Sequence, residues 1–83
     1  MEAKEFQLEG ALNYWHNEKL GIMYQMRKID FTAQMEGRER TEEENQEVRR
    51  LLSEADKVQV KINEAQENLY QYYIERYETT NPK

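Results

Sequence analysis

The sequence predicts an all-α protein in which two long antiparallel helices form a coiled-coil helical hairpin. Two observations predict this fold. Hydrophobic residues recur at alternating steps of three and four in each half of the chain, and a short segment of turn and cap residues separates the halves. This spacing is typical of the a and d positions of a coiled-coil seam. The seam residues are Leu8, Leu12, Trp15, Lys19, Ile22, Met26, Ile29 and Ala33 in the first half, and Val48, Leu51, Ala55, Val58, Ile62, Ala65, Leu69 and Tyr72 in the second.

The break between the two halves lies at residues 37–41. Gly37 can adopt the left-handed backbone conformation that ends a helix, and Thr41 followed three residues later by Glu44 has the pattern of a capping box that begins a new one. The three consecutive glutamates after Thr41 also suit the positive end of the helix dipole. We therefore predict a single domain over residues 1–83, with helices at about 2–36 and 42–77, a turn at 37–41 and a frayed tail at 78–83.

The position of the turn also selects the register between the helices. When the chain folds back at 37–41, the numbers of facing seam residues add up to 80 or 81, so Ile22 faces Val58 and Trp15 faces Ala65. The large indole then meets a small side chain, as interdigitating layers require.

One seam position is polar, because Lys19 is expected opposite Ile62. Its ammonium can extend past Ile62 into water, or it can fix the register or the oligomeric state, as single polar seam residues do. The opposite charges expected beside the seam are Lys4 with Glu75 and Glu18 with Lys61.

Composition limits the class of protein. The chain has 35% charged and 37% hydrophobic residues and a formal net charge of −5, which is typical of a charged helical protein and argues against a nucleic-acid-binding protein. It has no cysteine, which excludes disulfides and thiolate metal sites. The apolar runs are too short for a membrane helix, and the first residues lack the pattern of a signal peptide. We expect a cytoplasmic location, in a cell or in an infected host cell.

Motifs for catalysis are missing from the sequence. His16 is the single histidine, and Asn13 occupies the position where a di-metal helical bundle needs a carboxylate. No glycine-rich phosphate loop and no nucleophile with a matching base is recognisable. We therefore expect no enzyme activity, no catalytic residue, no cofactor, no metal and no small-molecule substrate.

The two sides that flank the seam differ in character. One side carries mainly charged and polar residues, whereas the other gathers aromatic and aliphatic residues, as the core of a protein interface does. A second interpretation is that its tyrosines cover Trp15 and thicken a thin core while their hydroxyls stay in water. On the first interpretation the partner-binding residues are Phe6, His16, Leu20, Met23, Tyr70, Tyr73 and Tyr77.

Two functions agree with these features. The first is a protein–protein interaction or assembly module, such as a small adaptor, chaperone or scaffold, that binds a partner protein or a second copy of itself through its aromatic-rich open end. A homodimer of this kind would be a four-helix bundle with a larger core. The alternative is a small acidic inhibitor, virus- or mobile-element-encoded, that blocks a nucleic-acid-binding site with a row of carboxylates. Those carboxylates are Glu42, Glu43, Glu44, Glu47, Glu54 and Asp56, with arginines and a lysine interleaved.

Overall fold

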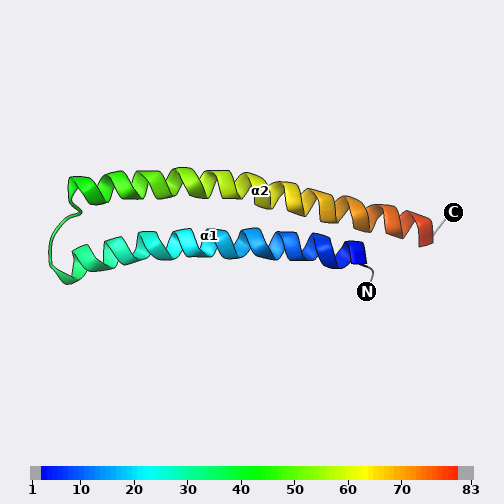
Figure 1. The fold of residues 1–83 in the computed structure, drawn as a ribbon, viewed down its shortest axis with the longest axis horizontal. Helices are drawn as coiled ribbons and strands as arrows, with labels where there is room; N and C mark the ends of the chain where they lie inside the picture. The colour runs from blue at the N-terminus through cyan, green and yellow to red at the C-terminus, as the bar shows by residue number, and fades with distance from the viewer. Residues whose placement is uncertain (1–2, 81–83) are drawn as a thin grey trace.

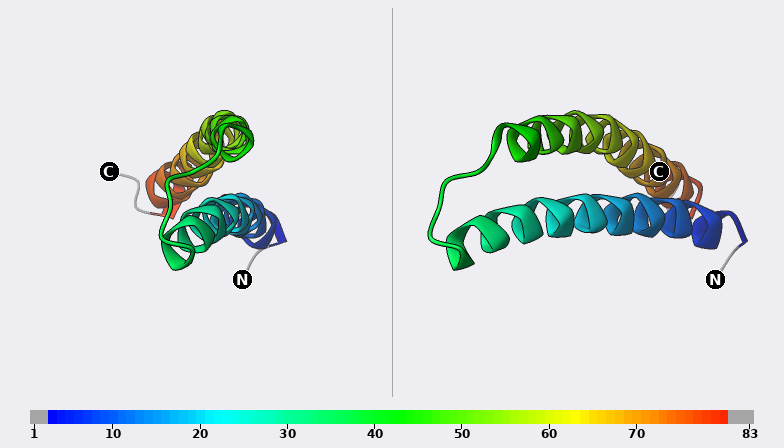
Figure 2. Two further views of the ribbon diagram at one scale, coloured as in Figure 1. Left: turned by 90° about the vertical axis from the view of Figure 1, so that its left-hand side faces the viewer. Right: turned by 60° about the vertical axis from the view of Figure 1, so that its left-hand side comes forward.

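The protein is a hairpin of two helices that lie side by side and antiparallel (Figure 1; Figure 2). The computed structural model describes the backbone of residues 3–80 and the side chains of residues 3–77. Helix α1 spans Ala3–Met35 and helix α2 spans Glu42–Thr80. The molecule is elongated, 64 × 19 × 18 Å. The predicted all-α helical hairpin is confirmed.

Helix α1 ends in a Schellman motif at Gly37. The Gly37 amide donates to the carbonyl of Gln34 and the Arg38 amide donates to the carbonyl of Ala33, both at 3.0 Å. Gly37 has φ of 64°, in the left-handed region that a residue without a Cβ adopts at no steric cost. The glycine therefore ends the helix in the way the sequence indicates.

Helix α2 begins with the predicted capping box. The Glu44 amide donates to the Thr41 hydroxyl at 3.1 Å, and the Thr41 amide donates to the Glu44 carboxylate at 2.9 Å. Arg38 donates to the same carboxylate at 2.7 Å. The Arg38 hydrogen bond, followed by the bond from the Thr41 backbone, lowers the pKa of Glu44 to about 2. Residues on both sides of the turn are thus tied together.

The core lies along the predicted seam. All the seam residues of both helices are buried or half-buried, and the fully buried ones are Ile22, Ala33, Leu51, Ile62 and Ala65. Among residues 3–77 no polar side chain is buried. One strip of aliphatic side chains, one layer thick, therefore supplies the apolar burial that holds the two helices together.

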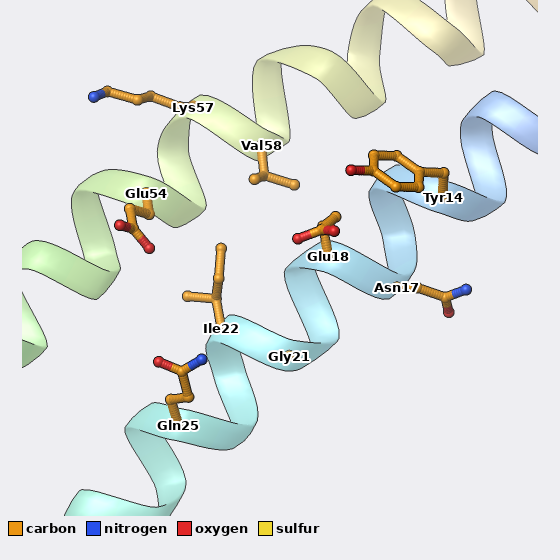
Figure 3. A pocket seen from close by; sticks show the side chains of 9 residues that line it. All are labelled: Tyr14, Asn17, Glu18, Gly21, Ile22, Gln25, Glu54, Lys57 and Val58. Atoms are coloured by element: carbon orange, nitrogen blue, oxygen red, sulfur yellow. The ribbon is translucent and has the colours of Figure 1, made fainter.

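Contacts between the helices agree with the predicted register. Ile22 and Val58 point toward each other across the space between the helices (Figure 3), and near the termini Arg76 pairs with Glu5. The seam lysine does reach past the core, because Lys19 Nζ donates to Gln59 Oε1 at 2.5 Å. The ammonium is thereby satisfied at the edge of the seam by a residue of the other helix.

The ends of the helices differ slightly from the prediction. Helix α1 ends at Met35, one residue before the expected end, because Glu36 is the cap residue that precedes Gly37 in the Schellman motif. Helix α2 continues through Thr80. The prediction of a frayed tail at 78–83 is therefore wrong for residues 78–80. The first helix-breaking signal after Tyr77 is Pro82, which disfavours the helical conformation only of the residue before it. The rest of the predicted tail, 81–83, and the predicted start at residue 2 lie outside the described residues.

Candidate interaction surface

At the open end of the hairpin, where α1 begins and α2 ends, a polar cluster joins the helices. The Tyr73 hydroxyl donates to Glu9 at 2.8 Å and to Glu5 at 3.5 Å, and Arg76 Nη1 donates to the other oxygen of Glu5 at 3.2 Å. Glu5 occupies a seam position, and its side chain is only 15% exposed. The cluster closes the end of the seam with charge-assisted hydrogen bonds where the apolar ladder stops.

Tyr73 is the best-defined member of this cluster. The hydrogen bond to Glu9, with partial desolvation and the negative charge of Glu5, raises the pKa of Tyr73 to about 12. The phenol therefore remains a neutral donor at any physiological pH. Its ring lies in a tilted arrangement on the half-buried ring of Tyr72, with centroids 5.9 Å apart.

Exposed aromatic rings lie in the same helical turns as the polar cluster. Tyr70 and Tyr77 lie one turn to either side of Tyr73 on α2, and Phe6 follows Glu5 on α1 and is 69% exposed. An aromatic ring that thickened the core would lose most of its exposure, so these three rings do not support the core-thickening interpretation. We call the rings of Phe6, Tyr70, Tyr73 and Tyr77, with Glu5, Glu9 and Arg76, the open-end surface.

The structure separates the seven predicted partner-binding residues into two groups. Phe6, Tyr70, Tyr73 and Tyr77 lie at the open end, whereas His16, Leu20 and Met23 lie farther along α1. At 1.5 Å per residue, Leu20 is about 20 Å from Phe6 along the helix. Leu20 and Met23 line a groove of about 240 Å³ together with Tyr24 and Arg27. His16 is exposed on α1.

Exposed apolar residues also lie on the outer side of α1, where none beyond Leu20 was predicted to bind a partner. Tyr24, Phe31 and Met35 are all highly exposed, and with Leu20 they form a stripe on the side of α1 that faces away from α2. The missed signal was a second helical spacing, because these residues recur at steps of four, seven and four. We call Leu20, Tyr24, Phe31 and Met35 the outer stripe.

A groove of about 460 Å³ lies on the side of the hairpin opposite the open-end tyrosines. Figure 3 shows Ile22 and Val58 at its floor, whereas Asn17 and Lys57 point away from it. Its rim is polar, with Glu18 and Glu54 on different helices. The described residues contain no group of three histidine, aspartate or glutamate side chains that could hold a metal.

Arginines pair with the carboxylates near the turn. Arg49 pairs with Glu42 at 3.1 Å, and Arg50 pairs with Glu47 and, at 2.5 Å, with Glu54. The Arg50 hydrogen bond lowers the pKa of Glu47, and in return Glu47 raises the pKa of Arg50. The pairing is local, and for Lys61 too the ion pair is with Glu64 of its own helix rather than with the expected Glu18.

Comparison of the chain with known protein families, with curated proteins and with solved structures found no match. Neither of the two described helices has a stretch apolar enough to cross a membrane.

Proposed function

We propose that the protein is a non-enzymatic interaction module, an adaptor or scaffold, that binds a partner protein through its open-end surface. The observation that carries this proposal is the exposure of Phe6, Tyr70 and Tyr77 in the same helical turns as the hydrogen-bonded cluster of Tyr73, Glu5, Glu9 and Arg76. Aromatic residues are enriched in interface cores, and exposed apolar side chains flanked by polar ones mark interaction sites.

The charges of the open-end surface indicate the chemistry of the partner. Glu5 is balanced by Arg76, whereas the hydrogen bonds that Glu9 accepts come from the neutral hydroxyl of Tyr73. A complementary partner would place apolar side chains on the three rings and a basic group beside Glu9. An amphipathic helix with one lysine or arginine on the edge of its apolar face has this composition. A second copy of the open-end surface would instead bring Glu9 close to another carboxylate, which favours a different protein as the partner.

The alternative of an acidic inhibitor has less support. A mimic of nucleic-acid phosphates needs uncompensated carboxylates in a row, but Glu42, Glu47 and Glu54 each pair with an arginine of the same helix. These pairs reduce the negative field that a basic site would recognise.

Affinity capture from the source cell with matched variants tests the proposal. Phe6→Glu combined with Tyr70→Glu changes two exposed positions of the open-end surface and should keep the helical content. Val60→Glu, on an exposed position of α2 far from that surface, is the control for an added carboxylate. A second control reverses the charges near the turn with Glu42→Lys, Glu43→Lys and Glu47→Lys.

We expect the open-end double variant to capture at least tenfold less of a partner that the wild type captures. The reason is that two carboxylates would enter a desolvated contact. The same partner should be retained by both controls. Retention by the double variant contradicts the proposal, and loss with the triple charge reversal indicates the inhibitor instead.

A further inference from the structure

The outer stripe is a second helix-packing face with no partner inside the hairpin. At about 100° per residue, its members fall within an arc of roughly 60° on α1, on the side opposite the seam. Tyr24 is 68% exposed and Phe31 is 63% exposed. Helix α1 is therefore apolar on two opposite sides, and α2 covers one of them.

We propose that the outer stripe binds a second copy of the chain, with the two α1 helices antiparallel about a two-fold axis. In such a pair, the numbers of facing residues add up to a constant. The residue numbers of Leu20 and Met35 add up to 55, and those of Tyr24 and Phe31 add up to the same value. Each apolar residue of the stripe therefore meets an apolar residue of the second copy.

The area of the outer stripe suits a homodimer. The members of the stripe expose on the order of 100 Å² each, so two copies would bury about 1,000 Å² with the stems of the adjoining polar side chains, near the lower limit of specific interfaces. Each hairpin alone has a core one layer thick, so a second apolar contact on α1 adds a substantial share of the total burial.

Two cations lie at the centre of this pairing, because a sum of 55 places Arg27 opposite Lys28 of the second copy, and their repulsion opposes the contact. Their long stems let both charges extend to water at the edge of the stripe. Arg27 lies between Tyr24 and Phe31 along the helix, close to the two-fold axis, and it lines the groove beside Tyr24. Its planar guanidinium can stack on an aromatic ring of the second copy, which is a favourable contact for arginine and not for lysine.

The antiparallel pairing leaves both open-end surfaces accessible. The two-fold axis passes near residues 27 and 28, so the open ends of the two copies would lie about 65 Å apart at opposite ends of the dimer. The dimer does not use the open-end surface. The homodimer and the proposed function can therefore fail independently.

Sedimentation equilibrium tests the dimer. The wild type should approach twice the monomer mass of 10.1 kDa as its concentration rises. Phe31→Glu should weaken the dimer on the order of 100-fold, because each dimer would lose two aromatic contacts and bring two carboxylates into a desolvated contact. Val60→Glu, at an exposed apolar position of α2, and the open-end double variant should both leave the dimer intact. Circular dichroism checks that each variant keeps its helices.

Single cysteines test the antiparallel arrangement, since the natural chain has none. Arg27→Cys lies beside its own copy in an antiparallel pair and should form a disulfide-linked dimer. Asn17→Cys lies on the same side of α1 but meets its own copy only in a parallel pair, so it should remain unlinked.

A wild type that stays at 10.1 kDa up to millimolar concentration overturns the proposal. A dimer that survives Phe31→Glu and dissociates in the open-end double variant also overturns it, and assigns self-association to the open end. Cross-linking of Asn17→Cys without Arg27→Cys contradicts the antiparallel arrangement.

Discussion

Truncation of Ile62 to alanine should destabilise the hairpin more than any change at the surface. Ile62 is 2% exposed at the centre of the seam. Ile62→Ala removes three carbon atoms, worth about 0.8 kcal/mol each in transfer free energy, and leaves a cavity that the neighbours fill only in part. We expect a loss of about 3 kcal/mol, a substantial share of the ~4–12 kcal/mol that is usual for a chain of this length.

Val60→Ala is the matched control for this change. Val60 is a β-branched residue of the same helix, two positions earlier, but it is 54% exposed. Alanine has the higher helix propensity, so the control should be neutral or more stable by up to about 0.5 kcal/mol.

Urea denaturation followed by far-ultraviolet circular dichroism measures both variants. It must be done at one protein concentration, because self-association would shift the midpoint. The midpoint should fall for Ile62→Ala and stay or rise for Val60→Ala. Equal losses for the two variants would refute the assignment of the seam.

The remaining predictions concern the turn and the open end. Thr41→Ala should lower the free energy of unfolding by about 1 kcal/mol because an amide at the start of α2 loses its cap, and urea denaturation measures the change. The pKa of Glu44 is lowered from 4.5 to about 2 in the fold, so its stabilising effect is present above pH 4.5 and is lost as the pH falls toward 2; thermal melts over this range should show a shallower acid dependence for Glu44→Gln. The pKa of Tyr73 is raised from 10.0 to about 12, so its stabilising effect is present below pH 10 and is lost as the pH rises toward 12. An ultraviolet titration should show one tyrosine ionising later than the rest, and Tyr73→Phe should remove that late step; a late step that persists in Tyr73→Phe would contradict this assignment.

Local chemistry explains why the sequence predicts most of the fold. The seam follows from residue spacing within each half, and the turn follows from Gly37 and the capping box, whose hydrogen bonds join residues at most five positions apart. Together they specify which residues face each other, as Ile22 and Val58 do. The end of α2 was less predictable, because residues 78–80 combine one good helix former, Glu78, with two threonines of lower helix propensity and contain no helix breaker.

The candidate surfaces were harder to predict than the fold. The bond between Tyr73 and Glu9 joins residues 64 positions apart, and its formation depends on side-chain conformations that no residue pattern encodes. The outer stripe was visible as a spacing in the sequence. Its spacing coincides with that of the seam, however, because both stripes repeat about every seven residues on opposite sides of the same helix.

Site-specific photo-cross-linking at Phe6 tests the central claim most directly. A photoreactive phenylalanine analogue at position 6 should link the chain, in its source cell, to one protein whose mass is not a multiple of 10.1 kDa. The same analogue at Val60 should give no such product. Products at Val60 but none at position 6, or products at position 6 that contain only further copies of the chain, would contradict an open-end surface that binds a different protein.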